Sequence, residues 1–264
     1  IHPTMSANHD SLRPGVFAIQ AQERIVHGQP AGSAVRAEAE RLGAHRVFVV
    51  STRSLAALAD GPLQRVVAAL GDRHAGTFSA VRAHSPREDV VAAAAAARAA
   101  GADLLVGVGG GSAIDATKAV QVCLWHGLVL VDDLEPYRSG APAERARPID
   151  PPADAIRMIA VSTTLSAPEF TAMAGITDSA TNTKQMFMHR LMVPRTAVLD
   201  PAATVHTPEG LEVVPVVYLT NAVFEQGAEP AALARQVWTL ARAMAGEGAF
   251  VFPELQVDCD WTDS

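Results

Sequence analysis

The sequence predicts an α/β fold in which a parallel sheet is covered by helices. From about Arg46 onward, short apolar runs alternate with alanine-rich stretches of helical length. The strand-like runs are apolar almost without a break, as expected for strands buried on both faces. One of them, Leu104–Val108, leads directly into three glycines at the start of a predicted helix. Strands that alternate with helices in this way imply βαβ units with right-handed crossovers.

Residues 33–83 are expected to hold two helices and two strands. Ser33 is placed to cap a helix that runs to Leu42, and Gly43 is placed to end it. A buried strand follows at Arg46–Ser51. Pro62 suits the first turn of a helix that runs to Leu70, and Gly76–Ala83 is the next strand.

A capping box is predicted where Ser85-Pro86-Arg87-Glu88 precedes an alanine-rich run. The helix that it opens covers Glu88–Ala100 and is closed by Gly101. The expected remaining elements are the strand Leu104–Val108, a helix from Ser112, and the strands Met158–Ser162 and Thr196–Leu199.

Composition narrows the class of protein. The chain has 264 residues, of which 49% are apolar and 19% charged, so it can bury a core. A net charge of -7 argues against a nucleic-acid or acidic-membrane partner, since both need a concentrated positive field. Two cysteines form neither a disulfide framework nor a cysteine metal cluster. No apolar run reaches the roughly 18 residues of a membrane span, and the expected location is the cytoplasm.

Two regions are expected along the chain, a main α/β domain at 12–205 and a short, mostly helical segment at 206–264. Inside the first region, Tyr137–Asp154 holds four prolines and reads as a loop. In the second, Pro230–Met244 is an amphipathic helix candidate. The apolar run Val213–Leu219 is a candidate for covering the sheet or for a dimer edge, so a homo-oligomer is expected.

The most informative stretch is the glycine loop at Gly109-Gly110-Gly111 and the helix that Ser112 opens. Glycines let the backbone turn sharply and approach a ligand closely, and a helix start attracts phosphate. Asp115 is placed to complete the helix cap, and Lys118 lies one turn further on the same face. The alternative is a glycine-rich turn of any α/β protein with a solvated lysine. The pattern is neither a P-loop nor the Rossmann G-x-G-x-x-G.

Four motifs in order resemble the iron-type alcohol dehydrogenase and maleylacetate reductase family. The first is Gly109-Gly110-Gly111-Ser112-x-x-Asp115-x-x-Lys118. Ser162–Thr171 resembles the family's second nucleotide loop, and Ala174–Asp178 the segment after it. Pro194–Pro201 with Thr207-Pro208-Glu209 resembles the family's fourth stretch. The resemblance covers roughly residues 15–209 and implies a Rossmann-like dinucleotide-binding domain, of the dehydroquinate synthase-like N-terminal type.

The resemblance also implies which residues bind NAD or NADP. Gly109, Gly110, Gly111 and Ser112 would hold the pyrophosphate, and Asp115 and Lys118 complete that motif. Thr163, Thr164 and Leu165 would lie along the adenosine and nicotinamide side. After the first strand of the domain, Ser51 and Arg53 stand in a run without the acid that many members use for the ribose. The resemblance therefore implies that Arg53 tolerates the 2′-phosphate of NADPH. The alternative is that Arg53 is a solvated loop residue without a role in binding.

The family's metal site is expected to be missing, because its histidines follow the T-P stretch. None of the nine histidines lies beyond His206. The catalytic residues are unknown, and His84 and His189 are the histidines to examine first; for each, the alternative is a structural or exposed side chain.

Three functions remain open on this sequence. The first is a metal-independent NAD(P)-dependent oxidoreductase that acts on a small oxo or hydroxy compound. The second is a nucleotide-binding relative without dehydrogenase activity, and the third is a lyase-type enzyme on the same scaffold. The first is preferred. The expected partners are a nicotinamide dinucleotide, a small-molecule substrate and further copies of the chain.

Overall fold

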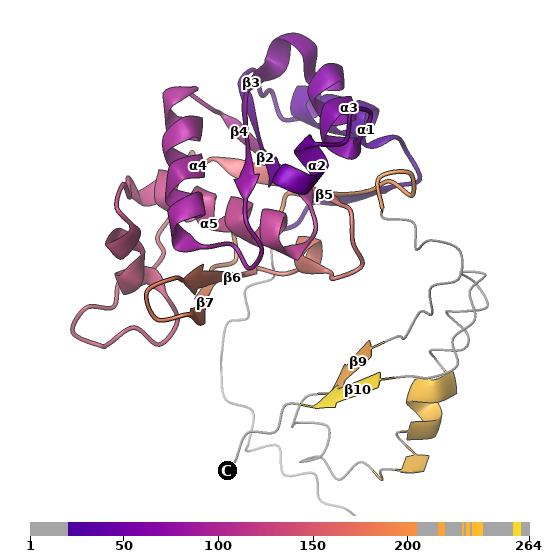
Figure 1. The fold of residues 1–264 in the computed structure, drawn as a ribbon, viewed down its shortest axis with the longest axis vertical. Coiled ribbons are helices and arrows are strands. Elements are labelled where there is room, and N and C mark those ends of the chain that lie inside the picture. Colours follow the sequence, from indigo (N-terminus) through magenta and orange to yellow (C-terminus); the bar gives the residue numbers. More distant parts are fainter. Residues whose placement is uncertain are drawn as a thin grey trace, which may run out of the picture. The chain divides into compact units, whose positions relative to one another are not determined.

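The computed structural model describes residues 21–204 and, beyond them, residues 216–219, 229, 231–232, 234–239 and 256–259. The chain divides into two compact units, Ile1–Val205 and His206–Ser264. The first unit, drawn from indigo to orange in Figure 1, contains the large sheet. The second contains a small sheet and is described separately below.

The first unit is built on a six-stranded sheet in which every pairing is parallel. The predicted parallel α/β fold is therefore confirmed, and each predicted strand lies within two residues of its expected bounds. The strand order is β1-β8-β5-β4-β2-β3. The strands are β1 (Arg24–His27), β2 (Val47–Thr52), β3 (His74–Val81), β4 (Leu104–Gly109), β5 (Arg157–Ser162) and β8 (Thr196–Leu199).

Helices cover both faces of this sheet (Figure 1). α1 (Ala31–Arg41) and α3 (Pro62–Leu70) pack on one face, and α4 (Arg87–Ala99) and α5 (Gly111–His126) on the other. The short helix α2 (Arg53–Ala56) follows β2. Side chains of β2 alternate between the two cores. Val47 and Val49 pack with α1 and α3, whereas Phe48 and Val50 pack with α4 and α5. This burial on both faces explains why the strands read as unbroken apolar runs.

The predicted cap of the first helix is wrong. α1 begins at Ala31, two residues before Ser33, whose hydroxyl donates to the Pro30 carbonyl at 2.9 Å. The first amide of the helix, that of Ala31, donates instead to Oδ2 of Asp200 at 2.8 Å. A residue that directly follows the last strand of the sheet therefore performs the capping, which local sequence does not reveal. Gly43 ends the helix with a φ of +67°, as predicted.

The prediction of a capping box at Ser85 is also wrong. α4 begins at Arg87, and Ser85 adopts the left-handed region with a φ of +53°. Its hydroxyl donates to the Ser112 carbonyl at 2.7 Å, while Glu88 accepts from the Ser179 hydroxyl at 2.9 Å. Both side chains thus serve contacts with distant segments rather than with the amides of the helix start.

A hairpin that the sequence analysis does not predict follows the loop of residues 162–171. β6 (Met173–Asp178) and β7 (Thr183–Met188) pair antiparallel, and β6 lies against α5. One face of the hairpin is buried through Ala174, Ile176 and Phe187. Before it, the 3-10 helix η3 (Val131–Tyr137) precedes residues 138–156, which hold no helix or strand, in agreement with the predicted proline-rich loop.

The second unit contains a pair of strands as well as helical residues. β9 (Val216–Leu219) pairs in parallel with β10 (Gln256–Cys259), a pairing that the sequence analysis does not predict. Residues 231–232 and 234–239 are helical, and the rest of the predicted helix Pro230–Met244 lies outside the described residues.

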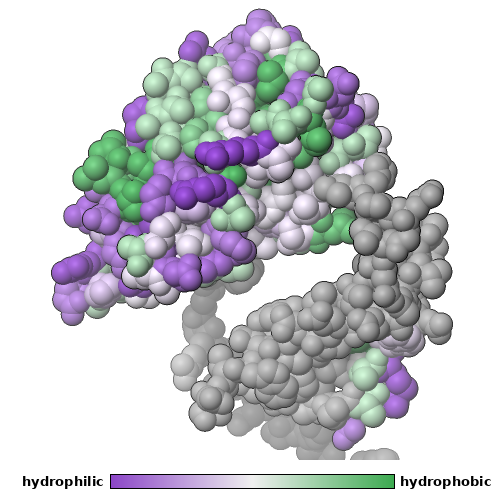
Figure 2. All heavy atoms as spheres, in the orientation of Figure 1, coloured by the Kyte–Doolittle hydropathy of each residue, from purple (hydrophilic) through white to green (hydrophobic). Residues whose placement is uncertain are grey.

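In the part of the chain that the structure describes, no single helix has the length and apolar content of a membrane span. α5 and η3 meet that test only together, as a pair bent by 91°. On the face of the first unit shown in Figure 2, hydrophilic and hydrophobic residues are mixed.

Candidate functional site

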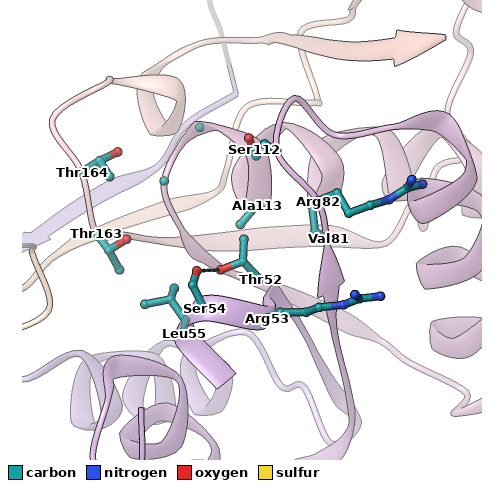
Figure 3. Close-up of a pocket in the computed structure, with 13 residues that line it drawn as sticks. Thr52, Arg53, Ser54, Leu55, Val81, Arg82, Ser112, Ala113, Thr163 and Thr164 are labelled. Carbon is teal, nitrogen blue, oxygen red and sulfur yellow. Dashed lines mark hydrogen bonds between the residues drawn. The ribbon is translucent and has the colours of Figure 1, made fainter. Parts of the chain in front are cut away.

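A pocket of about 540 Å³ lies where four neighbouring strands end. In the sheet, β3, β2, β4 and β5 are adjacent in that order, and the pocket is lined by the residues that follow their carboxyl ends. Figure 3 shows these segments converging on it. Its lining consists of Thr52, Arg53, Ser54, Leu55, Val81, Arg82, Ala83, Gly110, Gly111, Ser112, Ala113, Thr163 and Thr164.

The pocket lies at a point where the chain changes direction across the sheet. From β2 the chain proceeds to β3 on one side, whereas from β4 it proceeds to β5 on the other. Ligands of open α/β sheets bind in the crevice that such a reversal leaves at the carboxyl ends of the strands. The topology therefore selects this pocket as the candidate site.

Two glycines allow close packing at the start of α5, and the first of them, Gly109, is not part of the pocket lining. Gly109 has a φ of +150°, and a Cβ on it would lie 2.7 Å from Cβ of Ala113. A Cβ on Gly110 would lie 2.8 Å from Cγ2 of Thr164, which stands on the opposite wall. Gly111 and Ser112 then bring the first turn of a 16-residue helix to the pocket. The free amides and the positive dipole end of that turn suit a phosphate group.

A tight bend after β3 holds this first turn in place. His84 and Ser85 both have positive φ values, of 63° and 53°. The His84 amide donates to the Ser112 hydroxyl at 3.0 Å, and the Ser85 hydroxyl donates to the Ser112 carbonyl. Thr177 of β6 is bonded to the carbonyls of both bend residues. His84 therefore acts through its backbone; its exposed side chain is not part of the pocket lining.

Two arginines stand on one side of the pocket, and Figure 3 shows their side chains extending in the same direction. Arg82 forms a bidentate ion pair with Asp89, with distances from 2.8 to 3.1 Å. Arg53 has no hydrogen bond or ion pair to any residue that the structure describes. Beside it, the hydroxyls of Thr52 and Ser54 are bonded at 3.0 Å. The pocket lining contains no carboxylate.

The loop of residues 162–171 forms the facing wall. The Thr163 amide donates to the Gly109 carbonyl at 3.1 Å, and the Ser162 hydroxyl to the Thr164 carbonyl at 2.8 Å. Thr163 and Thr164 line the pocket. Leu165 does not, and its side chain is 92% exposed.

Asp115 and Lys118 are not part of the pocket lining. The Lys118 ammonium is fully buried and donates to the carbonyls of Pro168 and Met173, at 2.6 and 2.7 Å, and to the Thr171 hydroxyl. Burial lowers the pKa of Lys118, and the nearby Asp115 carboxylate opposes that shift. Asp115 accepts from the Gly175 amide at 3.1 Å rather than capping α5. Both residues thus attach the loop of residues 162–171 and the hairpin to α5.

Two further predicted residues also lie elsewhere. The Ser51 side chain is buried and donates to the Val108 carbonyl at 2.8 Å, which joins β2 to β4. His189 packs edge-on against Trp125, with ring centroids 6.1 Å apart, and its Nδ1 accepts from the Leu191 amide. Burial lowers the pKa of His189, which keeps the neutral ring that this acceptor role requires.

The structure therefore brings together Gly110, Gly111, Ser112, Arg53, Thr163 and Thr164 from the predicted set. It adds Leu55, Val81, Arg82 and Ala83, which the sequence analysis misses. These residues lie at or just after the carboxyl ends of β2 and β3, and their proximity to the glycine loop depends on the strand order. The sequence did offer a signal for three of them, because Val81–Ala83 ends a predicted strand and ligands bind at the carboxyl ends of parallel strands.

No group of three His, Cys, Asp or Glu side chains is placed to hold a metal ion among the described residues. Burial raises the pKa of the Cys123 thiol to about 12, so this thiol is inert at neutral pH.

A comparison with protein families matches residues 22–201 to the model described as iron-containing alcohol dehydrogenase. Dehydrogenase FUM7 of Gibberella moniliformis is 30% identical over 188 residues, which are 70% of this chain and 44% of that protein. Maleylacetate reductase 2 of Cupriavidus pinatubonensis is 34% identical over 178 residues, which are 67% of this chain and 40% of that protein.

Solved structures agree on the fold. The maleylacetate reductase of Rhizobium sp. strain MTP-10005 superposes with a TM-score of 0.55 at 27% identity, and the match covers 75% of this chain and 46% of that one. The chain thus spans less than half the length of the relatives that it matches.

Proposed function

We propose that this chain, which belongs to the iron-containing alcohol dehydrogenase family, binds NAD(P)H in the pocket at the ends of β2 and β4. The observation that carries the proposal is the Gly110 position. A Cβ there would collide with the Thr164 side chain, so glycine lets the backbone approach that wall directly before a helix start that attracts phosphate.

Each wall of the pocket has a role in this proposal. The first-turn amides at Gly111 and Ser112 bind the pyrophosphate, and the bend at His84 keeps Ser112 in position. Thr163 and Thr164 offer hydroxyls along the opposite side. When bound, the nicotinamide ring supplies the hydride, and the residues of the chain position it.

For the whole protein we propose oxidoreductase activity on a small oxo or hydroxy compound. The relatives are named dehydrogenases and reductases, including maleylacetate reductases. Among the described residues, no three His, Cys, Asp or Glu side chains are placed to hold a metal ion. The proposal therefore assigns no step to a metal, and it includes metal-independent activity.

A second function, nucleotide binding without hydride transfer, is favoured by one observation. The pocket lining contains no His, Asp, Glu, Lys, Cys or Tyr that would move a proton to or from a substrate. In this case the chain would bind the dinucleotide without turning over a substrate.

The proposal is tested by titrating the purified chain with NADH and NADPH and following nucleotide fluorescence. Gly110→Asp places a carboxylate against the bound pyrophosphate and against Thr164. We expect affinity to fall at least about tenfold, which corresponds to about 1.4 kcal/mol. Metal analysis of the same sample is expected to find no stoichiometric iron or zinc.

The matched control is Ala95→Asp, which adds the same charge at an exposed position of α4. It should leave binding unchanged, and circular dichroism checks that both variants are folded. If neither nucleotide binds to the parent chain, the proposal is abandoned. Binding without turnover of small ketones, aldehydes or alcohols supports the second function.

A further inference from the structure

We infer that the pocket selects dinucleotides that carry a 2′-phosphate, with Arg53 as the residue that recognises this group. The inference rests on the proposed function, because it assigns specificity within the same pocket. In chemical terms, the preferred cofactor is NADP(H) rather than NAD(H).

The position of Arg53 follows from the topology. With the pyrophosphate at the start of α5, after β4, the adenosine extends across the carboxyl end of the neighbouring strand, β2. The residues after β2, Thr52 to Leu55, form that side of the pocket. In dinucleotide-binding sheets an acid at this place binds the ribose hydroxyls, and an arginine accommodates a 2′-phosphate.

The charges at this end of the pocket favour an anion. Two arginines and no carboxylate line the pocket, although the chain as a whole has a net charge of -7. The guanidinium of Arg82 already forms the bidentate pair with Asp89, so much of its charge is neutralised. Arg53 is exposed, and the described residues offer it no partner.

The side chains of Arg53 and Arg82 point in the same direction (Figure 3). In Figure 3 the side chains of Arg53 and Arg82 extend from β2 and β3 toward the same side of the pocket. A phosphate between them would accept hydrogen bonds in the bidentate geometry that guanidinium groups provide. Arg82, held rigid by Asp89, would then supply a second, weaker contact.

A ribose with a free 2′-hydroxyl gains little at this position. The hydroxyls of Thr52 and Ser54 are bonded to each other, and no carboxylate is present to accept from the ribose. The difference between the two cofactors therefore arises mainly from the interaction of Arg53 with the phosphate.

The test measures the dissociation constants of NADPH and NADH for the parent chain and for Arg53→Ala. We expect tighter binding of NADPH by the parent chain. The variant should weaken NADPH binding by about tenfold or more, as expected for loss of a charge-assisted hydrogen bond. NADH binding should stay within about twofold. Arg53→Lys, which keeps the charge but not the planar fork, should give an intermediate loss.

A pair of small ligands isolates the phosphate. Adenosine 2′,5′-bisphosphate should compete better than adenosine 5′-monophosphate with the parent chain, and this advantage should disappear in Arg53→Ala. Arg147→Ala is the matched control, because Arg147 is exposed and outside the pocket lining. It removes the same charge and should preserve the preference.

The outcomes separate the inference from the proposed function. Equal binding of NADH and NADPH by the parent chain, unchanged in Arg53→Ala, overturns the inference and leaves the proposed function standing. Equal losses for both nucleotides in Arg53→Ala also overturn it, since Arg53 would then act on a part that they share. Failure of both nucleotides to bind the parent chain removes the proposed function itself.

Discussion

A single side chain, that of Lys118, joins α5 to the loop of residues 162–171 and to the start of β6. Its ammonium is fully buried and bonded to two carbonyls and one hydroxyl. A buried charge is tolerated only when it is paired and hydrogen-bonded in this way. Lys118 therefore supports the pocket from behind, since the loop that it holds carries Thr163 and Thr164.

Lys118→Met is expected to destabilise the chain by about 2–4 kcal/mol, because it leaves the Pro168 and Met173 carbonyls without their donor. The free energy of unfolding, measured with urea, checks this value. Lys184→Met removes the other lysine, which is exposed, and should change stability by less than about 0.5 kcal/mol. Equal effects of the two substitutions would contradict the assigned role.

At the scale of residues, sequence predicts which side chains follow the glycine loop but not which way they point. Asp115 and Lys118 share a helix face, and only the packing of β6 against α5 shows that this face is covered by protein. Arg82 is missed for a different reason. It lies 28 residues before Gly110 in the chain, and only the order of β3, β2 and β4 brings the two into one pocket.

At the scale of secondary structure elements, α1 depends on a cap from a distant part of the chain. Oδ2 of Asp200 accepts from the Ala31 amide at 2.8 Å, and Oδ1 accepts from the Ala202 amide at the same distance. Asp200 is nearly buried and directly follows β8. One carboxylate thus orders both the end of the last strand and the start of the first helix.

Asp200→Ala should lower the free energy of unfolding by about 1–2 kcal/mol, the range for loss of a helix cap. Ser33→Ala is the informative comparison, because Ser33 is the cap that local sequence suggests. The Ser33 hydroxyl is exposed and bonds only the Pro30 carbonyl, so this variant should lose less than about 0.5 kcal/mol. A larger loss in Ser33→Ala than in Asp200→Ala would refute the distant cap.

Elements with a strong apolar or glycine signal are predictable, and those that depend on tertiary contacts are not. The core strands β2, β4 and β5 appear in the sequence as unbroken apolar runs because helices cover both of their faces. β1 is mostly exposed at the edge of the sheet and has a weak pattern. The hairpin β6–β7 buries only alternate residues, among which Ala174, Ile176 and Phe187 occur within mixed polar sequence.

At the scale of the whole molecule, the hairpin presents a partly exposed apolar face. Met173 and Met188 are directly paired across the strands and are 40% and 57% exposed, and Met186 lies on the same face. Exposed apolar patches of this kind mark association surfaces. This observation supports the expectation that the chain forms a homo-oligomer.

Light scattering of the chain at micromolar concentration should therefore give a mass of at least twice 27.6 kDa. The double variant Met173→Lys with Met188→Lys should shift the population toward the monomer, because it places like charges opposite each other on a symmetric interface. Val129→Lys modifies another exposed apolar residue away from the hairpin and should keep the parent mass. A monomeric parent chain would disprove the proposed association.

The burial of Lys118 also has a practical consequence for labelling chemistry. The sequence contains two lysines, and one of them is closed off inside the fold, so amine-reactive dyes find a single lysine side chain, that of Lys184. Lys184 borders a small cavity together with Asp115 and Ser166, beside the loop that bears the two threonines of the pocket. A fluorophore attached to this lysine would report on the loop of residues 162–171 without the introduction of a cysteine.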